Sequence, residues 1–419
     1  MPHTHAHDGG AHVTPPAVRR RLALALAPFA LATLVGLVAL WPRGDVRIDA
    51  GPAAPRYGAT VTSVSEEACD DLLDGAQRFS CTQVRARLRS GPDAGDVVTF
   101  PAAATAGAPA FEAGDRILVS RAEAEGGAPA YFFVDYERTL PLTVLAALFA
   151  IVVVALSRWN GVAALAGLGV SLFVLVSFVL PAILAGRNPV AVAVVGSAAI
   201  MFVALYLAHG FHAGTTTAVL GTMCSLVLTG ALALVFVEAA KLTGLSSEDA
   251  LLLQVSAEQV NLEGLLLGGI VIGTLGVLDD VTVTQASAVW ELHHANPSFG
   301  ARDLYRSAVR IGRDHIASTV NTLVLAYAGA ALPLLILFSL SNRPFGDVLT
   351  SEVLAVEIVR TLVGSIGLVA SVPLTTGLAA LVVSRGHGTG GPSRARRAVG
   401  ALRRRDYAPP RAEREWRSE

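Results

Sequence analysis

Long apolar runs with almost no charge dominate the chain. Residues 141–183, for example, contain a single charged side chain, that of Arg158. A helix needs about 20 mainly apolar residues to cross the hydrocarbon core of a membrane, and these runs are too long for a soluble core. The pattern therefore predicts a polytopic α-helical membrane protein with about eight transmembrane helices. They are expected at 22–42, 141–157, 161–183, 189–208, 214–237, 264–285, 317–340 and 362–383.

Residues 43–138 have a different pattern, in which short runs alternate apolar and polar positions. The runs are 59–64, 82–88, 96–100 and 116–120, separated by Gly, Pro and Asp turn signals. This alternation predicts a small β-rich, barrel-like domain between the first two spans. Cys69 and Cys81 lie in it, twelve positions apart. They are disulfide candidates if the domain is extracytoplasmic, and otherwise two unpaired thiols.

The segment 246–262 is too polar to be a span. It opens with Ser246-Ser-Glu-Asp249, a helix-capping pattern, and it carries a further acid at Glu258. We therefore expect an interfacial or loop helix here.

Charge is scarce and sorted along the chain. Only 16% of the residues are charged, whereas a soluble domain has about 25%. This composition excludes a soluble enzyme or a disordered chain, and the net charge of −1 gives no indication of nucleic-acid binding. Because basic loops stay in the cytoplasm, a cytoplasmic N-terminus is favoured. In this orientation most basic residues lie on the cytoplasmic side, namely Arg19–Arg21, Arg158, Arg302, Arg306, Arg310, Arg313 and the tail from Arg385. The basic residues on the outer side are Arg187, Lys241 and Arg343.

This orientation gives the expected domain organisation, with both termini in the cytoplasm. Residues 1–21 form a cytoplasmic tail containing His and Arg, and 22–42 form the first transmembrane helix. Residues 43–138 form the extracytoplasmic domain, 139–384 a seven-helix membrane domain, and 385–419 a basic cytoplasmic tail.

The most distinctive stretch is 264–291, where one helical face carries glycines first and polar residues afterwards. We call this face the α-helical stripe; it consists of Gly269, Gly273, Gly276, Asp280, Thr284, Ser287 and Glu291. Its glycines predict close approach of another helix. Asp279 points about 100° away, on the side of Thr282 and Gln285. Carboxylates within a span usually line an ion or substrate path. The alternative is that Asp280 caps the helix or pairs with an arginine of the row 302–313.

Two further regions have candidate residues. His315 and Asn321 add polar groups to the span that follows the arginine row, and a histidine there could couple to protons or simply lie at the interface. Gly214 and Gly221 begin a small-residue face in another span, which helix packing explains without a substrate. The acid pair could also mark a break of its helix, as in transporters with discontinuous helices.

Motifs of the common enzyme classes are absent from the sequence. It contains no Walker motif, Rossmann fingerprint, HExxH or nucleophile elbow, and no CxxC. We therefore expect no enzyme activity, no cofactor and no bound metal.

The segment from Thr274 to Glu291, TLGVLDDVTVTQASAVWE, resembles a signature of the YibE/F family of bacterial membrane proteins. The segment from Gly312 to Tyr327, GRDHIASTVNTLVLAY, resembles a second one. The order of one helix, a β-rich insert and a multi-span region also fits this family over most of 55–385. Members often have Asn-Asp where this chain has Asp279-Asp280, which implies that Asp280 is the retained acid. The resemblance implies a multi-pass protein of the bacterial plasma membrane and names no substrate.

Two functions remain open at this point. The first is a secondary transporter or channel for an unidentified small solute or ion, in which the acids, His315 and the glycine-lined spans form the path. The second is a non-transporting scaffold or envelope-stress component that binds a partner through its extracytoplasmic domain. The expected partners are the lipid bilayer and the solute or ion, and the small-residue stripes are compatible with a homo-oligomer.

Overall fold

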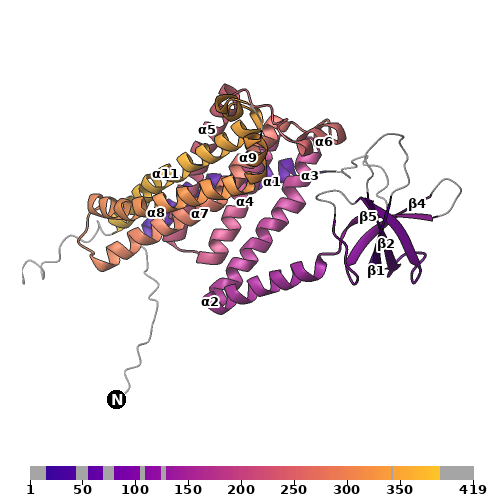
Figure 1. The fold of residues 1–419 in the computed structure, drawn as a ribbon. Coiled ribbons are helices and arrows are strands. Elements are labelled where there is room, and N and C mark those ends of the chain that lie inside the picture. Colours follow the sequence, from indigo (N-terminus) through magenta and orange to yellow (C-terminus); the bar gives the residue numbers. More distant parts are fainter. Residues whose placement is uncertain are drawn as a thin grey trace, which may run out of the picture. The chain divides into compact units, whose positions relative to one another are not determined.

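The computed structural model describes residues 16–43, 55–68, 80–103, 109–123, 129–340 and 343–386 (Figure 1). Helices make up most of this part of the chain, and a single sheet accounts for its strands. This arrangement confirms the expectation of a mainly helical protein with one small β-rich domain.

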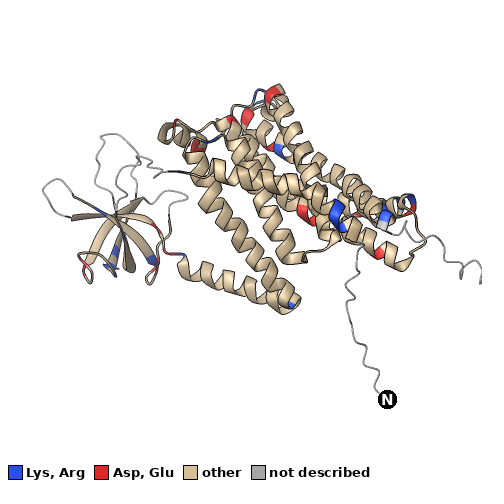
Figure 2. Cartoon of the chain, turned by 180° about the vertical axis from the view of Figure 1, so that it is seen from behind, with Lys and Arg blue, Asp and Glu red and all other residues tan. Residues whose placement is uncertain are grey.

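Six stretches are long and apolar enough to cross a membrane, or seven if one bent helix pair is a single span. Figure 2 shows that long parts of these helices carry no charged residue. The protein is therefore a multi-span membrane protein. The stretches are α1 (Pro16–Leu40), α2 (Thr139–Val174) with η1 (Leu175–Val179) and α3 (Leu180–Leu184), α4 (Pro189–His209), α5 (Ala213–Ala239), α7 (Leu262–Ala295) and α11 (Glu352–Gly386), and the bent pair is α8 (Ala301–Ala330) with α9 (Leu332–Ser339).

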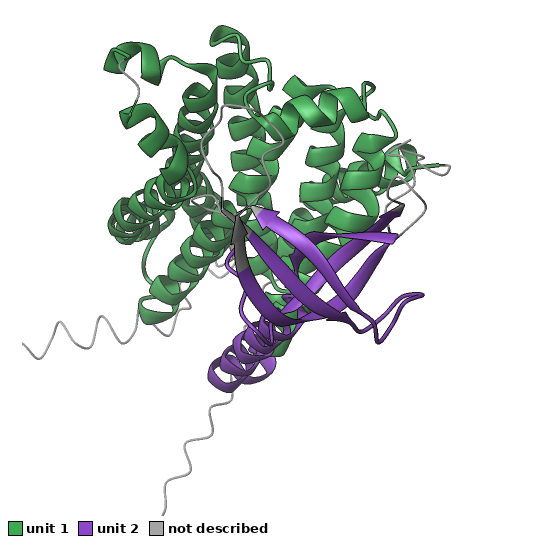
Figure 3. Ribbon diagram, turned by 45° about the vertical axis from the view of Figure 1, so that its right-hand side comes forward, with its two compact units in different colours: residues 1–47, 162–419 green, residues 48–161 purple. Residues whose placement is uncertain are grey.

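The chain divides into two compact units (Figure 3). Unit 1 comprises residues 1–47 and 162–419, and unit 2 comprises residues 48–161. The sheet and the first half of α2 belong to unit 2, and the remaining helices belong to unit 1.

Unit 2 contains a five-stranded antiparallel sheet with the strand order β3-β2-β1-β4-β5. The edge strands β3 and β5 also lie against each other, so the sheet curls towards a barrel. The unit is thus a small curled antiparallel sheet, in agreement with the barrel-like domain that the sequence predicts. The strands are β1 (Arg56–Ala68), β2 (Ser80–Leu88), β3 (Val97–Ala103), β4 (Arg116–Glu123) and β5 (Pro129–Tyr136).

The alternating pattern explains the core of this sheet. On β2, Val84, Ala86 and Leu88 are buried while the residues between them face outward, as expected for a period of two. The hydroxyl of Tyr131 on β5 donates a hydrogen bond to Asp93. Burial, together with this bond, raises the pKa of Tyr131 to about 12, so its hydroxyl remains a donor at neutral pH.

The sequence pattern did not reveal β5. Tyr131 and Phe133 face the core, but Phe132 and Val134 on the opposite side are also apolar and exposed. The strand therefore lacks the apolar–polar alternation that marks a half-buried strand. The disulfide prediction cannot be followed here, because Cys69 and the side chain of Cys81 lie outside the described residues.

A sharp break at Arg158 divides α2 into two helices. Arg158 has φ 52° and ψ −127°, which is outside the helical region. A Cβ atom at Gly161 would lie 2.5 Å from the carbonyl oxygen of Val153, so the chain folds back on itself here. The break falls between the predicted spans 141–157 and 161–183.

The span predicted at 317–340 differs from the observed one. Helix α8 begins at Ala301 and includes the arginine row, and the chain then bends by 64° between α8 and α9. Pro333 explains the bend, because it has no amide hydrogen and its ring clashes with the preceding helical turn.

Two short helices complete unit 1, namely α6 (Glu248–Ser256) and α10 (Phe345–Leu349). Helix α6 lies in the segment expected to form a loop helix. Its N-cap is Ser247, whose side chain accepts a hydrogen bond from the amide of Ala250, as the capping pattern predicted.

The break at Arg158 yields a testable prediction. A positive φ is strained for residues with a Cβ atom and easy for glycine, with a typical difference of about 1–2 kcal/mol. We expect Arg158→Gly to raise the thermal stability of the purified protein relative to Arg158→Ala. The alanine variant controls for the lost charge, since both variants remove it. Equal melting temperatures of the two variants would show that no left-handed turn exists at this position.

Candidate functional site

Helix α7 is the central element of unit 1 and contacts α4, α5, α8 and α11. It runs through the acid pair without interruption, so these residues do not mark a helix break. Asp279 lies 17 positions after Leu262 and 16 positions before Ala295. These separations correspond to about 26 and 24 Å along the helix. The acid pair thus lies at the middle of a helix that is longer than a membrane core is thick.

The side chain of Asp279 faces α5. Leu275 and Val283, one helical turn on either side of it, belong to an apolar cluster with residues of α4 and α5. The hydroxyl of Thr222 on α5 lies within hydrogen-bonding reach of the carboxyl group. The other carboxyl oxygen, Oδ1, is buried and has no hydrogen-bond partner among the described residues. Asp279 therefore has a largely apolar environment and incomplete hydrogen bonding.

Two threonines link α5 and α7 beside this carboxyl group. The hydroxyl oxygens of Thr222 and Thr282 lie 2.6 Å apart, and both residues are fully buried. Thr282 also donates to the backbone carbonyl of Asp279 at 3.2 Å. These bonds are neutral and supply no positive charge.

A counter-ion for the acid pair is not found within the described part of the chain. Its ion pairs involve neither Asp279 nor Asp280, nor any arginine of the row 302–313. The alternative in which Asp280 pairs with that row therefore has no support. No group of three or more His, Cys, Asp or Glu that could hold a metal ion occurs among the described residues either.

A second polar contact lies nearer the C-terminal end of α7. Thr376 of α11 donates to the side-chain oxygen of Gln285 at 3.0 Å, and both residues are fully buried. The amide nitrogen of Gln285 has no partner among the described residues. It faces Gly312 of α8, where an added Cβ atom would lie 2.7 Å from it. Gln285 thus joins three helices through one side chain.

The stripe on α7 lies on its exposed face. Asp280, Thr284, Ser287, Glu291 and the three glycines are all exposed. Nothing lies within 4 Å of a Cβ atom built at Gly269 or Gly276, and the nearest atom at Gly273 is the Tyr327 hydroxyl, 3.5 Å away. The close helix approach expected at these glycines is thus absent from the described chain. The two acids have different environments, because Asp279 is half-buried with its Oδ1 atom inaccessible, whereas Asp280 is exposed.

The remaining candidates are scattered. His315 is half-buried with its Nε2 atom unpartnered among described residues, whereas Asn321 is exposed. Gly221 of α5 packs directly against Thr375 of α11, and Gly214 lies against the ring of His212. The structure brings Asp279 together with Thr222 and Gln285 together with Thr376.

Sequence reasoning missed Thr222 and Thr376 as site residues. Thr222 follows Gly221 immediately but lies on a neighbouring face of the helix. Thr376 lies three positions after Pro373, and the kink expected at that proline was the feature that drew attention there. The available signal was the presence of polar residues at the middle of apolar spans.

A bundle of long apolar helices around a central helix with a half-buried acid defines a multi-span membrane protein with an internal polar site. The chain belongs to the YibE/F family, since the model of the YibE/F-like protein family matches residues 145–385. This match confirms the resemblance for residues 145–385, and α1 and β1–β5 lie outside it. Neither the curated proteins nor the solved structures give a match to the chain.

The contact between Gly312 and Gln285 can be tested by adding one methyl group. Gly312→Ala would place a Cβ atom 2.6 Å from Val372 and 2.7 Å from Gln285. We expect it to destabilise the protein by about 1–3 kcal/mol through overpacking, measured as a lower melting temperature. Gly329→Ala on the same helix meets nothing within 4 Å and should be neutral or stabilising. Equal stability of the two variants would contradict this packing.

Proposed function

We propose that this protein is a secondary transporter that couples the movement of a small solute to protons through Asp279. The observation that carries the proposal is the carboxyl group of the half-buried Asp279 at the middle of α7, whose Oδ1 atom is buried and has no partner among the described residues. Burying a carboxylate in apolar surroundings without a counter-ion is costly. A negative charge at Asp279 is therefore expected to be neutralised by a bound proton or cation. A coupling site of a transporter binds such an ion.

The ligands around Asp279 fit a proton better than a metal cation. They comprise one carboxyl group and the hydroxyls of Thr222 and Thr282. Hard metal cations usually take six or more oxygen ligands. A proton needs one oxygen, and Oδ1 is free to take it.

Access from water is supplied, in this proposal, by the stripe on the exposed face of α7. An acid facing lipid at mid-span would cost about 2.5–3.5 kcal/mol on insertion scales, so Asp280 should face water or protein. The stripe runs along α7 from Gly269 to Glu291. We propose that it lines a water-filled crevice next to α8, whose Tyr327 lies beside Gly273.

The proposed topology has eight spans, both termini in the cytoplasm and the sheet outside the bacterial plasma membrane. It is supported by the break at Arg158, which divides α2 into two spans, and by the α8–α9 pair as one bent span. The distribution of basic residues supports the orientation.

A second candidate function is a scaffold that binds a partner through unit 2. It is favoured by the outward side of β5, where Phe132 and Val134 are exposed, because exposed aromatic residues often mark interaction sites. This candidate predicts that the purified protein moves no solute.

The transport proposal predicts different effects for the two neighbouring acids. We would reconstitute the full chain in liposomes that contain a pH-sensitive dye and add a panel of small organic and inorganic solutes outside. Asp279→Asn should lower solute-driven proton entry by about tenfold or more, equivalent to at least about 1.4 kcal/mol in the rate. Because the family members that this chain resembles often have Asn at this position, the coupling proposed here is particular to chains with an acid at position 279. Asp280→Asn removes the neighbouring, exposed acid of the stripe and should lower the flux less. Asp347→Asn in α10 is the matched control, since it makes the same change at an exposed acid outside the stripe, and it should retain most of the flux. Wild-type flux in the Asp279 variant would reject the coupling role, and no flux in the wild-type protein would favour the scaffold.

The water-filled crevice has its own test. In a Cys224→Ser background, Thr284→Cys should react with a membrane-impermeant thiol reagent, because Thr284 is exposed. Thr282→Cys, two positions away, should stay unreactive because Thr282 is fully buried. Both labelling rates are compared with that of the background protein. An unreactive Thr284→Cys would show that lipid or protein covers the stripe.

A further inference from the structure

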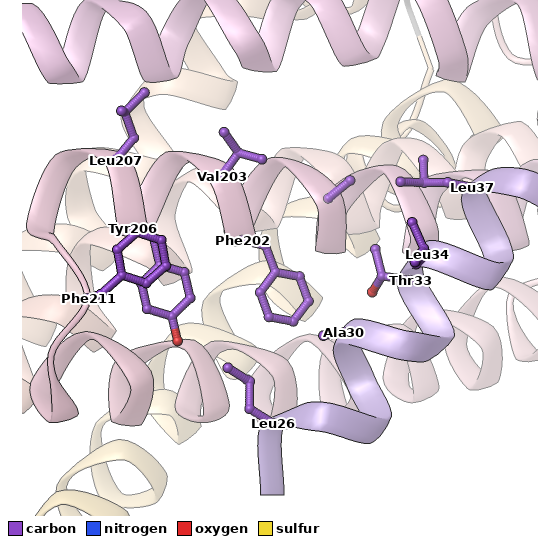
Figure 4. Close-up of a pocket in the computed structure, with 11 residues that line it drawn as sticks. Leu26, Ala30, Thr33, Leu34, Leu37, Phe202, Val203, Tyr206, Leu207 and Phe211 are labelled. Atoms are coloured by element: carbon purple, nitrogen blue, oxygen red, sulfur yellow. The ribbon is translucent and has the colours of Figure 1, made fainter. Parts of the chain in front are cut away.

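An open apolar groove lies between α1 and α4 in unit 1 and has a volume of about 790 Å³. Figure 4 shows Leu26, Leu34 and Leu37 of α1 on one side and Phe202 and Val203 of α4 on the other. The one hydroxyl that α1 contributes, on Thr33, is already bonded to the carbonyl of Phe29. The groove therefore offers its occupant almost only apolar contacts.

The groove continues into a second, smaller cavity of about 210 Å³ at the N-terminal end of α1. The two share Leu26, Tyr206 and Phe211 as lining residues. Phe211 stacks on Tyr206 with ring centroids 4.7 Å apart (Figure 4). The stacked pair thus lies at the junction of the two cavities.

The smaller cavity is more polar than the groove and carries a positive charge. Arg19 lines it, and no acidic side chain pairs with Arg19 among the described residues. The first turn of α5 also lines it, with His212 as N-cap, and the positive end of a helix dipole favours anions. Neither cavity is lined by an aspartate or a glutamate. The charge at this end suits an anionic group.

The dimensions of the groove match one membrane leaflet. Leu26 and Leu37 are eleven positions apart on α1, which corresponds to about 16 Å along the helix. Half of a hydrocarbon core is about 15 Å. Pro28 lies within this stretch, and because a proline kinks its helix, α1 is not expected to close straight against α4. An acyl chain that follows the groove would end near the middle of the bilayer.

We propose that the two cavities together form a binding site for an anionic phospholipid of the leaflet at the N-terminal end of α1. The phosphate lies beside Arg19 and the first turn of α5, and one acyl chain fills the groove between α1 and α4. Basic pockets between membrane helices bind anionic headgroups in this manner. The site is separate from Asp279 and does not depend on the proposed transport.

The test is native mass spectrometry of the full chain in detergent, with phosphatidylglycerol or phosphatidylcholine of identical acyl chains added. We expect one phosphatidylglycerol to be retained in preference to phosphatidylcholine. Arg19→Gln should weaken this retention about fivefold. Arg20→Gln is the matched control, since it removes the same charge from the neighbouring position but lines neither cavity.

A second pair of variants tests the groove without changing charge. Ala30→Phe should fill the groove and lower the retention of the lipid, whereas Ala32→Phe places the same ring on α1 outside it. Equal retention of both lipids by the wild-type protein, or equal losses in the Arg19 and Arg20 variants, would reject the headgroup site. Unchanged binding by the Ala30 variant would show that the acyl chain lies elsewhere.

Discussion

A carboxyl group between apolar helices must find hydrogen-bond partners within the protein, because the membrane core contains no water to supply them. In unit 1 this requirement applies to Asp279, whose nearest polar side chains are those of Thr222 and Thr282. Thr222 and Thr282 bring α5 and α7 together at this level, and their hydroxyls occupy positions that water would otherwise need to fill. One oxygen remains without a partner. The carboxyl group of Asp279 thus lacks one hydrogen-bond partner, so a single proton or ligand atom bound at this oxygen can change its hydrogen bonding.

Helices α5 and α11 are held closely by two pairs of one glycine and one threonine. Gly221 of α5 contacts Thr375 of α11, and Gly367 of α11 contacts Thr229 of α5. Small residues let membrane helices approach closely, where van der Waals packing can stabilise them without a hydrophobic driving force. Most of the buried hydroxyls donate to carbonyls of their own helix, as Ser225 does to Gly221. The core of unit 1 can therefore contain many polar groups at little cost.

The sequence was sufficient for the class of protein and for most helices, because runs of apolar residues report directly on membrane spans. It was also sufficient to name Asp279, Asp280 and Gln285. It could not decide which acid is the more buried, since both lie on the same apolar helix and only the positions of α5 and α8 distinguish their sides. The bend before Pro333 was missed because the residues on both sides of it, from 323 to 338, are mainly apolar. Strand β5 was missed because both of its sides are apolar.

The break at Arg158 has a consequence for the length of the helices on either side of it. An uninterrupted helix from Thr139 to Leu184 would have 46 residues and a length of about 69 Å, more than twice the thickness of a hydrocarbon core. The break at Arg158 divides this stretch into two shorter helices, each close to the length that a hydrocarbon core requires. A single residue with a positive φ thus limits the length of both helices that meet at it.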